Sequence, residues 1–150
     1  MSIVLGVVMD PIAAINPNKD TSLAMLLAAQ KRGWTLLYME QSDLYLCQGQ
    51  ARARTRALTV SSDTDHWFSL GTSNDQDLGD LDVILMRKDP PFDSEFVYST
   101  YILEAAESQG ALVVNRPQSL RDCNEKIFAT QFPDCCPPVL VSRDSERLRN

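Results

Sequence analysis

Residues 81–93 read LDVILMRKDPPFD, and this stretch decides which kind of sheet the chain builds. Its apolar first half predicts a buried strand, and Arg87, Lys88 and Asp89 emerge at that strand's carboxyl end. Pro90 and Pro91 stop the ladder, because proline lacks an N–H and fixes φ. In open α/β sheets ligands bind outside the carboxyl ends of the strands. The cluster therefore predicts recognition of a small anionic or zwitterionic molecule, unless it is a solvated loop whose charges only pair with one another.

The segments near the N-terminus predict a β-loop-α-β unit. Residues 3–9 are continuously apolar, as expected for a strand of a parallel sheet covered on both faces. Asp20, Thr21 or Ser22 can cap a helix that ends with the cations at 31–32, and Gly33 suits the position after it. Residues 34–39 predict the second strand. This order is typical of mononucleotide-binding α/β folds.

The middle of the chain predicts a hairpin over residues 44–60, with a glycine-containing turn. Arg52, Arg54 and Arg56 alternate with small residues, so they share one face of the second arm. They form either a basic strip facing an anion or the charged side of a half-exposed edge strand, and the edge strand is favoured for Arg52 and Arg54. Residues 61–80 are polar and predict a surface excursion, held down by Trp67 and Phe68.

The second half resumes the alternation of helices and strands. Asp93 can cap a helix over residues 94–109, and Gly110 ends it. The apolar stripe of this helix is expected at Val97, Ile102 and the residues in phase with them, Tyr101, Ala105 and Ala106. Residues 111–114 predict a short strand. A helix through 126–132 follows, capped by Asp122 with Glu125 or by Asn124, and residues 139–141 predict a last strand.

Composition limits the class of protein. The 150 residues suit one domain, with 44% hydrophobic and 23% charged residues. The net charge of −6 argues against nonspecific nucleic-acid binding, and no apolar run approaches the length of a membrane span. The N-terminus has no basic region typical of a signal peptide. The cysteines (Cys47, Cys123, Cys135 and Cys136) have no C-x-x-C spacing, and His66 is the one histidine, so we expect free thiols, no zinc site and a cytoplasmic location.

Glycine-rich phosphate-binding motifs are absent from the sequence. The turn after the first predicted strand lacks G-x-G-x-x-G, and there is no P-loop. The remaining anion-binding devices are the helix N-termini after Asn18 and after Asp122, helped by Lys126 and by the pair Arg87 and Lys88. These residues predict part of a nucleotide site.

Long strings in this sequence resemble bacterial glutathione synthetase, a member of the ATP-grasp superfamily. They are GVVMDPI at 6–12, DLYL at 43–46, VILMRKDPPFD at 83–93 and NRPQSLRDCNEK at 115–126. The resemblance runs over residues 1–150. It implies an α/β fold in which residues 1–121 form a parallel-sheet, Rossmann-like pre-ATP-grasp domain that binds substrate. Residues 122–150 would be the truncated beginning of the ATP-grasp domain.

The resemblance also implies a reaction. Family enzymes are about twice this length, so the chain is expected to be an N-terminal part that is inactive alone. In the complete enzyme, ATP phosphorylates γ-glutamylcysteine to an acyl phosphate, and glycine displaces the phosphate to give glutathione. The implied cofactors are ATP and Mg²⁺, with Mn²⁺ as the alternative ion, and the implied assembly is a homotetramer. The competing hypothesis is a non-catalytic α/β binding or interaction domain derived from such a ligase.

The resemblance assigns roles to seven residues of this chain. Arg87, Lys88 and Asp89 would bind the substrate, Arg87 through a carboxylate, because a guanidinium pairs bidentately with that group. Asp89 would either face the α-amino group of the substrate or brace Arg87. Weaker assignments to the same role, on the loop and helix start after the first strand, are Asp10, Asn16 and Ser22. Lys126 would contact the nucleotide. No side-chain nucleophile and no metal ligand are expected within these 150 residues.

Overall fold

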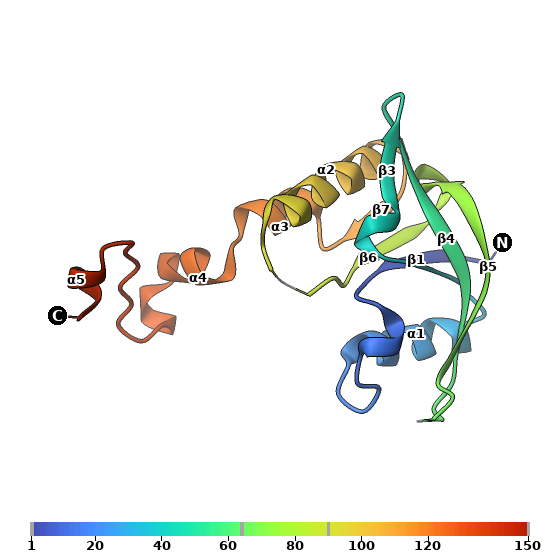
Figure 1. Ribbon diagram of the computed structural model, residues 1–150, viewed down its shortest axis with the longest axis horizontal. Helices are drawn as coiled ribbons and strands as arrows, with labels where there is room; N and C mark the ends of the chain where they lie inside the picture. The colour runs from blue at the N-terminus through green and yellow to red at the C-terminus, as the bar shows by residue number, and fades with distance from the viewer. Residues whose placement is uncertain (1, 64, 90, 150) are drawn as a thin grey trace.

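The computed structural model of this chain describes residues 2–63, 65–89 and 91–149 (Figure 1). Pro90, which the sequence analysis expected to help end a strand, lies outside the described residues, as do Met1, Thr64 and Asn150. The strands are β1 (Val4–Val8), β2 (Thr35–Met39), β3 (Leu44–Cys47), β4 (Gln50–Val60), β5 (Phe68–Asp77), β6 (Val83–Met86) and β7 (Leu112–Val114). The helices are α1 (Thr21–Lys31), α2 (Ser94–Gln109), α3 (Pro117–Asp122), α4 (Glu125–Phe128) and α5 (Ser145–Arg149), with short 3₁₀ turns between them.

The seven strands form one mixed sheet in the order β3-β4-β2-β1-β6-β7, with β5 paired to β4. Strands β2, β1, β6 and β7 are parallel neighbours, whereas β3, β4 and β5 are joined by antiparallel pairing. Helices α1 and α2 lie on opposite faces of the sheet (Figure 1). The α/β class with a parallel sheet is therefore confirmed, as is the predicted hairpin over residues 44–60, whose arms are β3 and β4, and strand β5 is an addition.

The predicted β-loop-α-β unit at the N-terminus is confirmed as β1, α1 and β2. Of the candidate caps, Asp20 is the one used, because its side chain accepts a hydrogen bond from the Ser22 backbone N–H at 2.6 Å. Gly33 has a φ of 75°, which lets the chain turn from α1 into β2 without side-chain strain. The core under α1 is built by the odd-numbered residues of β1, with Leu5 and Val7 both buried.

Helix α2 has the predicted bounds and the predicted cap, Asp93, but its buried stripe matches the expected one only in part, at Ala106 and at the partly buried Ile102 and Ala105. The sheet-facing residues are Phe96, Ser99, Thr100, Leu103 and Ala106, whereas Tyr101 is 49% exposed. Two polar residues lie on the buried face because their hydroxyls donate to backbone carbonyls one turn back, Ser99 to Glu95 and Thr100 to Val97. Apolar residues alone therefore misplace the stripe.

The predicted surface excursion over residues 61–80 is mostly exposed and is held down by Trp67 and Phe68 as expected, but residues 68–77 form a strand, β5, that was not predicted. This strand pairs with β4, which has β2 and β3 on its other side, so β4 is not an edge strand. Arg52 and Arg54 lie directly opposite Asp77 and Asp75, and the Arg52–Asp77 pair closes at 2.8 Å. Cross-strand charge pairing offsets the low strand propensity of β5.

The C-terminal segment also differs from expectation. Helix α4 ends at Phe128 and continues only as a 3₁₀ turn, and its cap is Asn124 rather than Asp122, which ends α3. Residues 139–141 form no strand and are 51–59% exposed. A strand needs a neighbouring backbone to pair with, and this segment extends away from the sheet (Figure 1).

Candidate functional site

The charged residues after β6 meet the end of β1 at the carboxyl edge of the sheet. Strands β1 and β6 are parallel neighbours, so the residues that follow each of them leave the sheet side by side. The Lys88 Nζ lies 2.9 Å from Asp10 Oδ1, and the Asp89 backbone N–H donates to Asp10 Oδ2 at 3.0 Å. The Lys88 ammonium also donates to the Asp89 carbonyl. Asp10 therefore binds the 87–89 turn to the end of β1.

Arg87 points to the other face of the sheet. Its Nε donates to Ser22 Oγ at 3.1 Å, and Nη2 donates to Thr21 Oγ1 at 2.9 Å. Both hydroxyls belong to the first turn of α1, and Ser22 is buried there. Two directed hydrogen bonds hold the guanidinium at the helix start, where backbone N–H groups already favour negative charge.

The period-two alternation of β6 explains this divergence. Ile84 and Met86 pack in the core under α2, whereas Val83 and Leu85 pack on the α1 side. If the alternation continues past the end of β6, the Arg87 side chain points towards α1, and the Lys88 side chain points towards α2 and Asp10. Arg87 and Lys88 were expected to form one cationic cluster, but they lie on opposite sides of the same sheet edge.

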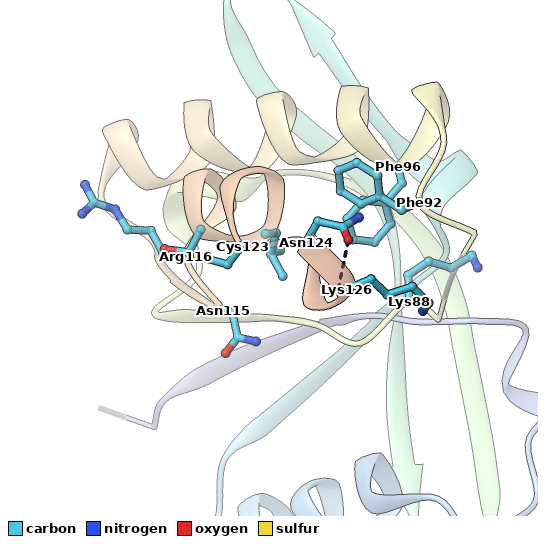
Figure 2. Close-up of a pocket in the computed structure, with 10 residues that line it drawn as sticks. Lys88, Phe92, Phe96, Asn115, Arg116, Cys123, Asn124 and Lys126 are labelled. Atoms are coloured by element: carbon cyan, nitrogen blue, oxygen red, sulfur yellow. Dashed lines mark hydrogen bonds between the residues drawn. The ribbon is translucent and has the colours of Figure 1, made fainter. Parts of the chain in front are cut away.

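A cavity of about 610 Å³ lies between this edge and α3 (Figure 2). Phe92 and Phe96 lie together beneath α2, with ring centroids 5.4 Å apart. Lys88 and Lys126 lie on the same side of the cavity, while Arg116 extends from its far end (Figure 2). The cavity is lined by Lys88, Phe92, Phe96, Asn115, Arg116, Ser119, Leu120, Cys123, Asn124 and Lys126. Its wall combines an aromatic surface with cationic and amide groups, which suits a ligand with a planar part and an anionic part.

Two neighbouring cavities are lined by three more of the predicted residues, Asp10, Asn16 and Asp89, whereas Arg87 and Ser22 line none of the three cavities. One of about 520 Å³ shares Lys88 with the first cavity and is otherwise acidic, with Asp10, Glu40 and Glu95 on its wall. The next, about 420 Å³, is lined by Asp10, Asp89 and Asn16 among others. Asn16 also accepts the Asn18 backbone N–H at 3.0 Å, so it shapes the loop before α1. Carboxylates and ammonium groups alternate along this edge, which is an arrangement suited to a zwitterion.

A buried tyrosine holds the loop after β1 in place. The Tyr38 hydroxyl accepts the Ile12 backbone N–H at 3.1 Å and donates to Glu40 Oε1 at 2.6 Å. The guanidinium of Arg56 lies 5.1 Å from the Tyr38 ring centroid and 3.8 Å from the Glu40 carboxylate. Burial, and then the hydrogen bond to Glu40, raise the pKa of Tyr38 well above its ordinary value.

This shift gives a pH dependence that Tyr38→Phe should remove. Unfolded tyrosine ionises near pH 10, while folded Tyr38 stays neutral, so its contribution is complete below about pH 10 and is lost as the pH rises further. We expect the free energy of unfolding to fall above pH 10 by up to about 1.4 kcal/mol per pH unit from this group. Urea unfolding at pH 8 to 11 checks this. Parallel pH profiles for the wild type and Tyr38→Phe would contradict it.

Several residues of the site escaped the sequence analysis. Phe92 and Phe96 line the largest of these cavities, and neither had been assigned a role. Asn115 and Arg116 directly follow β7, so the rule that pointed to the residues after β6 also applies to them. Glu40 follows β2 in the same way. Every parallel strand of the sheet thus delivers a polar residue to this edge.

The described residues contain no group of three or more His, Cys, Asp and Glu side chains that could hold a metal ion. All four cysteines are free thiols, as expected. Across the described part of the chain, no helix combines the length and apolar character needed to cross a bilayer.

Comparison with known proteins gives a consistent result. The family model described as prokaryotic glutathione synthetase, N-terminal domain, matches residues 3–121. A glutathione synthetase of Pseudomonas aeruginosa is 69% identical over 149 residues, which is 99% of this chain and 47% of that relative. Glutathione synthetases of Yersinia pestis and Salmonella typhimurium are 64% and 61% identical over 145 residues, covering 97% of this chain and 46% of each relative. The chain spans about half the length of the curated relatives it matches.

Proposed function

The chain belongs to the prokaryotic glutathione synthetase family, through its N-terminal domain, and from this premise we propose that it forms the substrate-binding half of an ATP-dependent ligase. The family is one of ligases that make glutathione. The substrates would be γ-glutamylcysteine, glycine and ATP. The observation that best supports this proposal is the carboxyl edge, where Lys88 is paired to Asp10 and Arg87 is held by α1.

The proposed substrate site uses the two cations in different ways. Arg87 is exposed beyond its bonds to α1, and its guanidinium can donate hydrogen bonds to a carboxylate of γ-glutamylcysteine. Lys88 and the Asp10 carboxylate border the acidic cavity, and Asp10 and Asp89 border the cavity next to it, so the carboxylates there can take the α-ammonium group of the same molecule. Asn16 and Ser22 shape the loop and the helix start that carry these groups.

The nucleotide is proposed to approach the larger cavity, with Lys126 as its contact in this chain. Lys126 and Lys88 lie on the same side of that cavity, where two cations would counter phosphate charge (Figure 2). Residues 1–121 would then form the pre-ATP-grasp domain and residues 122–150 the start of the ATP-grasp domain. Free thiols agree with action in the cytoplasm, and a homotetramer is the expected assembly.

The proposed chemistry needs no nucleophilic side chain. ATP transfers its terminal phosphoryl group to the cysteinyl carboxylate, and the amine of glycine attacks the resulting acyl phosphate and releases phosphate. This chain would orient the carboxylate and exclude water, which are the larger contributions in phosphoryl transfer. The described residues do not fit a Mg²⁺ or Mn²⁺ site, so the ligands of that ion would come from another part of the full-length enzyme.

A hybrid enzyme tests the proposal. It consists of this chain followed by the part of the P. aeruginosa relative that lies beyond the matched residues. We expect the hybrid to release phosphate and form glutathione from γ-glutamylcysteine, glycine and ATP, while the 150-residue chain alone shows no turnover. The assay is phosphate release together with chromatographic detection of glutathione.

The control is a second hybrid, in which the matching residues of the S. typhimurium relative replace this chain. An active control beside an inactive hybrid would contradict the ligase proposal and favour a non-catalytic binding domain. Turnover by the 150 residues alone would contradict the division of labour between the two halves.

A further inference from the structure

Arg121 joins α3 to α2 through three different contacts. Its Nη2 lies 2.7 Å from Glu104 Oε2, and its Nη1 donates to Thr100 Oγ1 at 3.1 Å. Its guanidinium carbon lies 4.3 Å from the ring centroid of Tyr101. The Arg121 side chain is only 15% exposed. A stacked, doubly hydrogen-bonded guanidinium has one allowed position, so this contact fixes α3 relative to α2.

Arg121 also stands at the point where the chain leaves the body of the molecule. Helix α3 packs on α2 and ends at Asp122, and beyond it the chain extends away from the sheet (Figure 1). Asn124 caps the next helix, α4, and Lys126 is the second residue of that helix. The position of Lys126 relative to Lys88 is therefore set through the attachment of α3.

We propose that Arg121 is a positioning residue for nucleotide binding, which acts by fixing α3 and thereby the location of Lys126 at the cavity. The proposal rests on the nucleotide role proposed for Lys126. Arg121 itself does not line the cavity, whereas Ser119 and Leu120 of the same helix do. Its charge is already paired with Glu104, so its effect on a nucleotide is geometric.

Steady-state kinetics of Arg121 variants of the hybrid enzyme distinguish an effect of the position of Lys126 from an effect of the charge of Arg121. We expect Arg121→Ala to raise KM for ATP roughly ten- to a hundredfold, since a displacement of about 1 Å at a binding group can have effects of that size. KM for γ-glutamylcysteine should stay within about twofold, because Arg87, Lys88 and Asp10 are attached to β1, β6 and α1. Arg121→Lys should resemble Arg121→Ala, because lysine keeps the charge but lacks the planar guanidinium that bonds Glu104 and Thr100 at once while it stacks on Tyr101.

Arg54→Ala is the matched control. Arg54 also pairs with a carboxylate, Asp43 at 3.9 Å, but its side chain is 66% exposed and lies on β4. Both Michaelis constants should stay within about twofold of the wild-type values in this variant. A KM for ATP in Arg121→Lys that is close to the wild-type value would overturn the proposal, because it would show that the positive charge at this position is what matters. Equal changes in both constants for Arg121→Ala would also overturn it, as a loss of general stability.

Hydrogen exchange on the 150-residue chain tests the same inference without catalysis. We expect Arg121→Ala to speed amide exchange in residues 117–128 while the amides of β1 and β6 keep their protection. Unchanged exchange in α3 would overturn the proposal even if the hybrid proved inactive. An inactive hybrid with faster exchange in α3 would support the fixing of α3 by Arg121 and would count against the ligase function alone.

Discussion

Arg87→Ala in the hybrid enzyme is expected to raise KM for γ-glutamylcysteine roughly ten- to a hundredfold, because a hydrogen bond between charged groups contributes about 1.5–3 kcal/mol. KM for ATP should change less than about twofold. The guanidinium is oriented by Thr21 and Ser22 before any ligand arrives, so little ordering has to occur on binding. Initial rates measured against each substrate in turn separate the two constants.

Two further variants sharpen this result. Ser22→Ala removes one of the hydroxyls that orient Arg87, so it should raise KM for γ-glutamylcysteine by a smaller factor than Arg87→Ala does. Arg54→Ala again serves as the arginine control, since Arg54 is an exposed partner of Asp43. If Arg87→Ala altered the constants for ATP and γ-glutamylcysteine equally, the role given to Arg87 in binding the dipeptide would be refuted.

Leu103→Ala is expected to lower the free energy of unfolding by about 2–5 kcal/mol, the largest stability effect among these variants. Leu103 is fully buried on the face of α2 that packs against the sheet. Truncating Leu103 removes apolar contacts and leaves a cavity. The strands beneath it cannot move to fill that cavity, because the hydrogen-bonded register between β1 and β6 holds them in place. Urea unfolding followed by circular dichroism measures the change.

Leu112→Ala is the matched control for this substitution. Leu112 lies on β7 and is 58% exposed, so the same truncation should change the free energy of unfolding by less than about 0.5 kcal/mol. Similar losses in the two variants would show that α2 is not docked on the sheet through Leu103.

Local chemistry was enough to predict the parallel half of the fold. In β1, α1 and β2, an apolar run, a cap at Asp20 and a turn at Gly33 all indicate the same structure. The same agreement holds for β6 and α2, where Asp93 and Gly110 mark the ends of the helix. The bounds of these segments were predicted correctly because propensity and capping agreed, whereas the buried face of α2 was misplaced because it carries the polar residues Ser99 and Thr100.

The hairpin of β3 and β4 was predicted from its glycine-containing turn, but the third antiparallel strand, β5, could not be predicted in this way, because it depends on its partner. Its sequence is rich in Ser, Asn and Asp, which disfavour strands in isolation. The register that places Asp75 and Asp77 opposite the arginines of β4 is a tertiary fact. The sequence offered one signal for this pairing, which is that the acidic residues of β5 can be matched to Arg52 and Arg54 of β4.

The charged residues of the candidate site were predicted at the correct edge of the sheet, but their arrangement relative to one another was not. The strand pattern located Arg87 and Lys88 at a carboxyl end, yet their divergence depends on which helix covers each face. The pairing of Lys88 with Asp10 depends on β6 lying next to β1, and chain order does not specify that neighbour. Sequence reasoning therefore finds the residues of such an edge more readily than their partners.

A crystal structure of the hybrid enzyme with γ-glutamylcysteine bound would test the central claim most directly. The account predicts a carboxylate of the dipeptide within hydrogen-bond distance of the Arg87 guanidinium or the Lys88 ammonium, at the carboxyl ends of β1 and β6. A dipeptide held entirely by the other half of the enzyme, with both cations out of reach, would contradict it.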